Sequence, residues 1–117
     1  RMALDETERL ADQHFLIEQK NRSLKIPLKN IRYFKSDRKK ISAVTLNGTE
    51  EFYGKLSDIE NDLPDHFIRI HNRYLANLLQ ITDLCPASCI CGGEELPVSR
   101  ACRQQLAAAF ARTLLDN

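Results

Sequence analysis

The sequence predicts an α+β domain made mostly of antiparallel β-strands, and three observations support this class. Short segments in which apolar and polar residues alternate recur along the chain, as half-buried strands require. Turn residues, above all Asn47-Gly48 and Gly92-Gly93, separate these segments. The longest helical pattern comes last, where apolar residues repeat every four positions from Cys102 to Leu114. A series of strands followed by a helix is typical of the α+β class.

The alternating segments predict the strands individually. Pro27 lacks the N–H group that a strand ladder uses, so we expect its strand to lie at a sheet edge. Asn47-Gly48 is the favoured pair for a two-residue hairpin turn. We expect a polar turn over residues 19–23 and a loop over residues 36–40. The expected strands cover residues 15–17, 24–28, 31–35, 41–46, 49–53, 67–71, 79–84, 87–91 and 95–98.

Short helices complete the expected fold. Apolar residues at positions i, i+3 and i+7 predict an acidic helix over residues 56–63, which Pro64 ends. Residues 75–79 are compatible with a helical turn. The final helix is expected to begin after Ser99, whose hydroxyl can cap its first turn.

Length and composition indicate a single globular domain. The chain has 117 residues, of which 43% are hydrophobic and 28% are charged. No segment approaches the roughly 18 consecutive apolar residues of a membrane span, and no signal-peptide pattern is present, so we expect a cytoplasmic location. Because Arg1 precedes Met2, we do not expect a natural start at position 1. We expect a linker or the end of an upstream helix at residues 1–12, the domain at residues 13–114 and a tail at residues 115–117.

Positive and negative charges are segregated along the chain, although the formal net charge is only +1. Residues 20–40 contain nine basic residues and one acidic residue, whereas residues 50–65 contain six acidic residues and one basic residue. Further basic clusters follow at residues 69–73 and 100–103. A locally positive surface attracts a polyanion such as nucleic acid whatever the total charge. Basic residues that alternate along a strand are equally typical of a solvated face, so both interpretations stay open.

Four cysteines raise the question of a metal site. Three of them, Cys85, Cys89 and Cys91, have the spacing C-x3-C-x-C, and Cys102 follows eleven residues later. Structural zinc sites pair closely spaced cysteines with a second pair or with histidines, and this sequence offers neither arrangement. We therefore expect no metal and no cofactor, and we interpret Cys89 and Cys91 as small buried apolar groups. A redox role for the thiols stays open.

The motifs of common enzyme classes are missing from the sequence. It contains no Gly-rich phosphate loop, no H-E-x-x-H and no G-x-S-x-G, and only a Cys–His pair could act as a nucleophile. We expect neither enzymatic activity nor a small-molecule substrate. A single-stranded nucleic-acid or protein-interaction module is the alternative. Single-strand binding relies on exposed aromatic platforms, and the chain has five phenylalanines, three tyrosines and no tryptophan.

Three segments resemble a known family: KIPLKNIRYFKS at residues 25–36, EFYGKLSDIENDLPDHFIRIHNRYLANLLQI at residues 51–81, and ELPVSRACRQQL at residues 95–106. They are similar to the LytTR DNA-binding domain, the output domain of a class of bacterial response regulators. The resemblance covers residues 13–114. Its most specific part is F-x-R-x-H-x-x-Y-x-x-N at residues 67–77, which is followed by P-V-S-R.

The resemblance implies a fold, a partner and a signalling context. The fold would consist of two small antiparallel sheets with short helices and a C-terminal helix. Loops would read double-stranded DNA in successive major grooves, and two copies would bind direct-repeat sites. A regulatory part would lie upstream, as in a two-component system. The sequence departs from the family pattern in the cysteine-rich residues 85–93 and in the first loop, which is basic where the family holds a histidine.

The resemblance also implies which residues meet DNA bases. The loop of residues 37–40, the residue after the motif histidine and the arginine after the motif serine would reach base edges, which gives Lys39, Asn72 and Arg100 as candidates. An asparagine amide can pair with adenine, and a guanidinium group with guanine. Asn72 could instead be a turn residue that bonds its own backbone, and Arg100 could pair with Glu94 or Glu95.

Phosphate contacts are expected from basic residues near these three positions. Arginine in the first turn of a helix is opposed by the helix dipole, so Arg100 and Arg103 indicate an anionic partner there. His71 could alternatively be a structural residue, and Tyr74 a core residue. The phosphate-contact candidates are Arg38, Lys40, Arg69, His71, Arg73 and Arg103.

Overall fold

The computed structural model describes residues 13–115. The expected linker at residues 1–12 and residues 116–117 of the expected tail lie outside the described residues. The elements, in chain order, are β1 (His14–Gln19), β2 (Arg22–Pro27), η1 (Leu28–Asn30), β3 (Ile31–Asp37), β4 (Lys40–Thr45), β5 (Gly48–Tyr53), α2 (Leu56–Asp62), β6 (Phe67–His71), β7 (Tyr74–Asn77), η2 (Leu78–Gln80), β8 (Ile81–Leu84), β9 (Ser88–Cys91), β10 (Glu94–Pro97) and α3 (Arg100–Leu115).

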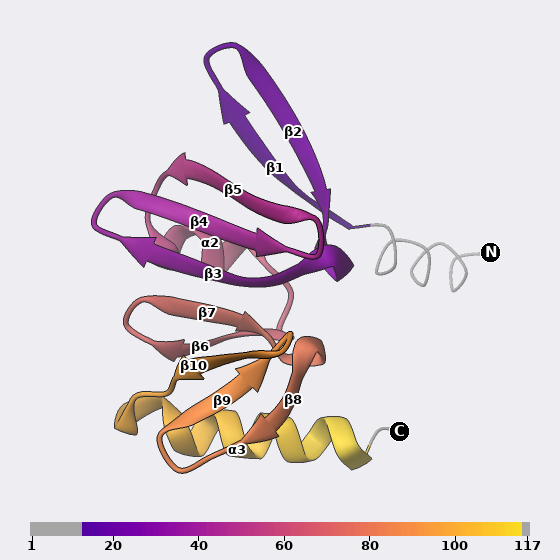
Figure 1. Ribbon diagram of the computed structural model, residues 1–117, viewed down its shortest axis with the longest axis vertical. Helices are drawn as coiled ribbons and strands as arrows, with labels where there is room; N and C mark the ends of the chain where they lie inside the picture. Colours follow the sequence, from indigo (N-terminus) through magenta and orange to yellow (C-terminus); the bar gives the residue numbers. More distant parts are fainter. Residues whose placement is uncertain (1–12, 116–117) are drawn as a thin grey trace, which may run out of the picture.

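All strand pairs in the described chain are antiparallel, which confirms the predicted fold class. A central sheet has the order β5-β4-β3-β7-β6, a second has the order β10-β9-β8, and β1 and β2 form a separate hairpin. The strands therefore divide among three sheets rather than the two that the family resemblance implied. Figure 1 shows the hairpin projecting from one end of the molecule and α3 lying along the other.

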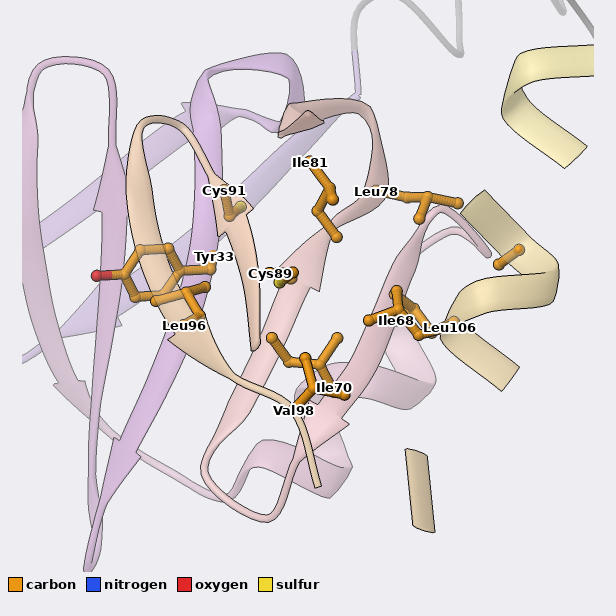
Figure 2. Packing of buried hydrophobic residues seen from close by; sticks show 12 residues of the cluster. Tyr33, Ile68, Ile70, Leu78, Ile81, Cys89, Cys91, Leu96, Val98 and Leu106 are labelled. Atoms are coloured by element: carbon orange, nitrogen blue, oxygen red, sulfur yellow. The ribbon is translucent and has the colours of Figure 1, made fainter. Parts of the chain in front are cut away.

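The central sheet is buried on both faces where β3, β7 and β6 run side by side. Successive residues of these strands point into different hydrophobic clusters, because side chains alternate between sheet faces. Phe34, Phe67 and Leu75 join the cluster with α2, whereas the residues beside them in sequence join the cluster with the three-stranded sheet and α3. Figure 2 shows this second cluster, in which Leu106 of α3 lies against Ile68 of β6.

Burial on both faces explains the prediction that was wrong over residues 75–77. Leu75, Ala76 and Asn77 are all buried, so no alternation marks them as a strand, yet they form β7. Only Leu78–Gln80 form the helical turn that was expected over residues 75–79. A continuous apolar run of this length is ambiguous between helix and buried strand.

Two turns differ by small shifts from the predicted ones. Thr45 pairs with Gly48, so Leu46 and Asn47 form the tip of the β4–β5 hairpin and Gly48 opens β5 with φ of 138°. The Thr45 hydroxyl fixes this register, because it donates to Gly48 O at 2.8 Å and accepts from Asn47 N at 3.1 Å. The expected loop over residues 36–40 is a tight turn, since Asp37 already pairs with Lys40.

Helix α3 packs against β6 and η2, shares a hydrophobic cluster with the three-stranded sheet and ends the described chain. Leu106 and Ala109 are buried, Cys102 and Phe110 are half-buried, and Leu114 is exposed, so only the middle of the predicted apolar stripe meets the core. Within residues 13–115, no helix is long and apolar enough to cross a membrane.

Candidate nucleic-acid interface

The three segments that carry the candidate DNA contacts lie along one edge of the molecule. They are the β3–β4 turn, the β6–β7 turn and the beginning of α3, which are found on the left side of Figure 1. We call this edge the basic edge. It is defined by Arg38, Lys39, Lys40, His71, Asn72, Arg73, Arg100 and Arg103.

Backbone hydrogen bonds join the three segments in series. Ser36 N, at the base of the β3–β4 turn, donates to Arg73 O at 2.8 Å. Ser99 N, just before α3, donates to Ile70 O at the end of β6, at 2.9 Å. The spacing of the three segments is therefore set by the sheet and not by flexible linkers.

The β3–β4 turn presents two basic side chains at its tip. Arg38 and Lys39 are exposed, and Gly54 N donates to Lys39 O at 2.9 Å, which holds the turn against the end of β5. Arg38 has φ of 62°, a left-handed conformation that costs a non-glycine residue about 1–2 kcal/mol. Lys40 Nζ lies 3.5 Å from Glu51 Oε1, and because both side chains are about half exposed, this pair is weak.

The β6–β7 turn exposes an amide and a guanidinium group. The side chains of Asn72 and Arg73 are exposed, and the Asn72 amide has no hydrogen-bond partner within residues 13–115. The alternative in which Asn72 bonds its own backbone is therefore not found. His71 Nδ1 accepts from Arg73 N at 3.2 Å, so the ring can carry its proton on Nε2 and donate outward. The ring of Tyr74 packs edge-on against His71, with centroids 5.7 Å apart.

Arg69 is the exception among the predicted phosphate ligands, because its guanidinium group is turned toward the protein. Its Nη2 lies 3.0 Å from Glu60 Oε1 on α2, and its Nη1 donates to Asn72 O at 3.3 Å. Its side chain is only 26% exposed. A sequence pattern that alternates Ile68, Arg69 and Ile70 shows which sheet face Arg69 occupies but not which acid it meets there.

The beginning of α3 carries two exposed arginines. Neither Arg100 nor Arg103 has an ion partner in the described chain. The two acids considered as alternatives are engaged elsewhere: Glu94 accepts from Tyr33 Oη at 3.1 Å, and Glu95 accepts from Ser88 Oγ at 2.8 Å. Both guanidinium groups are thus available to an external anion.

Two of the four cysteines belong to the hydrophobic core and not to this edge. Cys89 and Cys91 are fully buried, as predicted, and Cys91 Sγ donates to Arg32 O at 3.2 Å. Burial raises the pKa of the Cys89 thiol to about 11 and that of the Cys91 thiol to about 12. Cys85 is exposed. Among the residues that the structure describes, no group of His, Cys, Asp and Glu has the arrangement of a metal site.

Sequence reasoning missed the structural role of Asn77. This residue is 1% exposed, its amide nitrogen donates to Ile31 O at 2.8 Å, and its amide oxygen accepts from Leu79 N at 3.0 Å. It thereby ties β7 and η2 to the start of β3. The available signal was an asparagine inside an otherwise apolar run, since a buried amide is retained only when its hydrogen bonds are satisfied.

Comparison with known proteins identifies the family. The model of the LytTr DNA-binding domain matches residues 21–111, which is most of the chain. The chain belongs to the LytTR family. It is accordingly a DNA-binding domain, and the segments that form the basic edge all lie within the matched residues.

A solved LytTR structure has the same fold. The chain superposes on a LytTr DNA-binding domain from Bacillus cereus with a TM-score of 0.65 and 24% sequence identity, over 88% of this chain and 97% of the other. At this identity the likeness concerns the fold alone. No curated protein sequence matches the chain.

Proposed function

We propose that this LytTR domain binds double-stranded DNA sequence-specifically, as the output domain of a bacterial transcriptional regulator in a two-component system. The observation that carries the proposal is the basic edge itself. Three exposed side chains, from Lys39, Asn72 and Arg100, lie on segments that backbone hydrogen bonds join in series along one edge of the molecule, and none has an ion-pair or hydrogen-bond partner within residues 13–115. Such a row suits a duplex, whose grooves present base edges at fixed intervals.

The proposal gives these three groups the base contacts. Arg100 would donate in a bidentate manner to guanine, and the Asn72 amide would pair with adenine. Lys39 would donate to an acceptor on a base near the β3–β4 turn. All three side chains would enter major grooves from loops or from a helix end, and none would use a helix laid in the groove.

Phosphate contacts would come from the remaining members of the basic edge. Arg38, Lys40, Arg73 and Arg103 bring full charges, and His71 brings a ring N–H. The helix dipole and the free N–H groups at the start of α3 would add to the attraction. Two copies on direct-repeat sites, a regulatory region upstream of this domain and a cytoplasmic location belong to the same proposal.

Replacement of Arg100 by alanine tests base readout. The probe is a duplex selected by the domain from a randomised library, with a scrambled duplex for comparison. Arg100→Ala should weaken binding to the selected duplex by about 5- to 150-fold and binding to the scrambled duplex much less, because a base-reading arginine contributes mainly to discrimination. Asn72→Ala should behave similarly at a different base position.

Arg112→Ala is the matched control, because Arg112 is also exposed but lies in the last turn of α3, away from the basic edge. Its affinity for both duplexes should stay near that of the unmodified domain. An equal loss on both duplexes for Arg100→Ala would reduce Arg100 to a phosphate contact. Equal or tighter binding of single strands would favour the alternative module.

A further inference from the structure

We propose that Arg69 and Glu60 form a clamp that positions the β6–β7 turn for base readout, so that Arg69 acts as a positioning residue and not as a phosphate ligand. This inference rests on the proposed function, in which Asn72 meets a base. It assigns a role in DNA recognition to α2, an acidic helix that the basic edge does not include.

The geometry of Arg69 carries the inference. One guanidinium nitrogen holds Glu60 of α2 at 3.0 Å, and another donates to the backbone oxygen of Asn72 at 3.3 Å. A planar guanidinium group can engage two partners at once in fixed directions, which an ammonium group cannot do. The same side chain therefore connects a helix to the residue whose amide is left free on the surface.

Burial and charge support the clamp. The Arg69 side chain is 26% exposed and its Nε is buried without a hydrogen-bond partner, so this group is not displayed to a ligand. Glu60 is partly exposed, at 39%, and would repel a DNA phosphate that approached Arg69. An arginine that is partly withdrawn from water, and that binds both a carboxylate and a backbone oxygen, restricts a turn more firmly than an exposed ion pair does.

The two ends of this turn are held by the pairing of His71 with Tyr74, and the clamp adds a restraint at the tip of the turn. Arg73 O accepts from Ser36 N of β3, and Arg73 N donates to His71 Nδ1, so the second half of the turn is tied to the sheet. Asn72, at the tip, is tied by Arg69 through its carbonyl oxygen. Restraint before binding lowers the entropy lost on binding, and this gain appears only where the turn must adopt one geometry.

The test is Glu60→Ala, with Asp62→Ala as the matched control. Asp62 is exposed on the same helix and has no ion partner within residues 13–115, so its replacement makes the same charge change without touching the clamp. Glu60→Ala should weaken binding to the selected duplex by about 2- to 12-fold, the cost of ordering one further group on binding. Binding to the scrambled duplex and the salt dependence should match those of Asp62→Ala.

If Arg69 were instead a phosphate ligand, Glu60→Ala should raise the affinity for DNA and not lower it. Arg69 would be released from Glu60, would strengthen binding to both duplexes and would steepen the slope of log affinity against log salt by about 0.9. Arg69→Lys separates the two roles again. Lysine is a good phosphate ligand, but its donors lie on one freely rotating nitrogen and lack the fixed fork by which Nη1 and Nη2 of Arg69 reach Asn72 O and Glu60. Arg69→Lys should lose affinity for the selected duplex as Glu60→Ala does. Affinity retained in either variant would overturn the proposal.

A measurement without DNA keeps the clamp testable on its own. Amide hydrogen exchange at Asn72 and Arg73 should be faster in Glu60→Ala than in Asp62→Ala, and unchanged exchange would contradict the clamp. If exchange rises and Glu60→Ala loses affinity, the clamp holds. If Arg100→Ala discriminates between the duplexes while Glu60→Ala does not, the clamp alone fails. If Arg100→Ala binds both duplexes normally, the proposed base readout fails.

Discussion

Replacement of the buried Asn77 by alanine should destabilise the domain more than any change on the basic edge. Asn77 is 1% exposed and its amide satisfies two backbone groups, Ile31 O at 2.8 Å and Leu79 N at 3.0 Å. Each polar group left buried without a partner costs about 1–3 kcal/mol. Leu79 N is only partly buried, so we expect a loss of about 3 kcal/mol from a total stability of roughly 5–15 kcal/mol.

The assay is reversible urea and thermal unfolding followed by circular dichroism. A loss of about 3 kcal/mol lowers the melting temperature of a domain of this size by roughly 10–20 °C. Asn77→Asp keeps the acceptor for Leu79 N. Its ionised carboxylate has no donor for Ile31 O, whereas the protonated carboxyl has an O–H that can donate. The loss of stability should therefore be smaller at a pH where this carboxyl is protonated. A loss below about 1 kcal/mol for Asn77→Ala would refute the reasoning, because it would mean that water or a backbone shift replaces both hydrogen bonds.

Two further predictions concern charge. If Arg38, Lys40, Arg73 and Arg103 contact phosphates, log affinity for duplex DNA should fall with log salt at a slope of about −4, and a slope shallower than about −2 would remove these residues from the interface. Because burial raises the thiol pKa of Cys89 to about 11 and of Cys91 to about 12, the folded state binds more protons than the unfolded state above about pH 9. Stability from these thiols is thus complete below about pH 9. It should fall from about pH 9 to about pH 11 for Cys89 and to about pH 12 for Cys91, by up to about 1.4 kcal/mol per thiol per pH unit. Urea unfolding of the domain and of a Cys89→Ala/Cys91→Ala variant measures this, and equal alkaline losses in both would contradict it.

Features that depend on neighbouring residues were predictable from the sequence alone. Alternation located most strands, Gly92-Gly93 marked the β9–β10 turn, and the residues after Ser99 predicted α3, because strand and helix periods are properties of a short segment. The family motif also indicated two positions that the structure finds exposed, Asn72 and Arg100.

Features that depend on partners distant in sequence emerged only in the folded domain. β7 was mistaken for a helical turn because the sheet is covered on both faces, which removes the alternation from residues 75–77. Arg69 and Arg100 were both predicted from the sequence to contact DNA. In the structure Arg69 is paired with Glu60, whereas Arg100 has no ion partner in the described chain. Sequence spacing gives the face on which a charge lies, whereas its partner depends on which element packs opposite, and that is set by the burial of apolar surface over the whole domain.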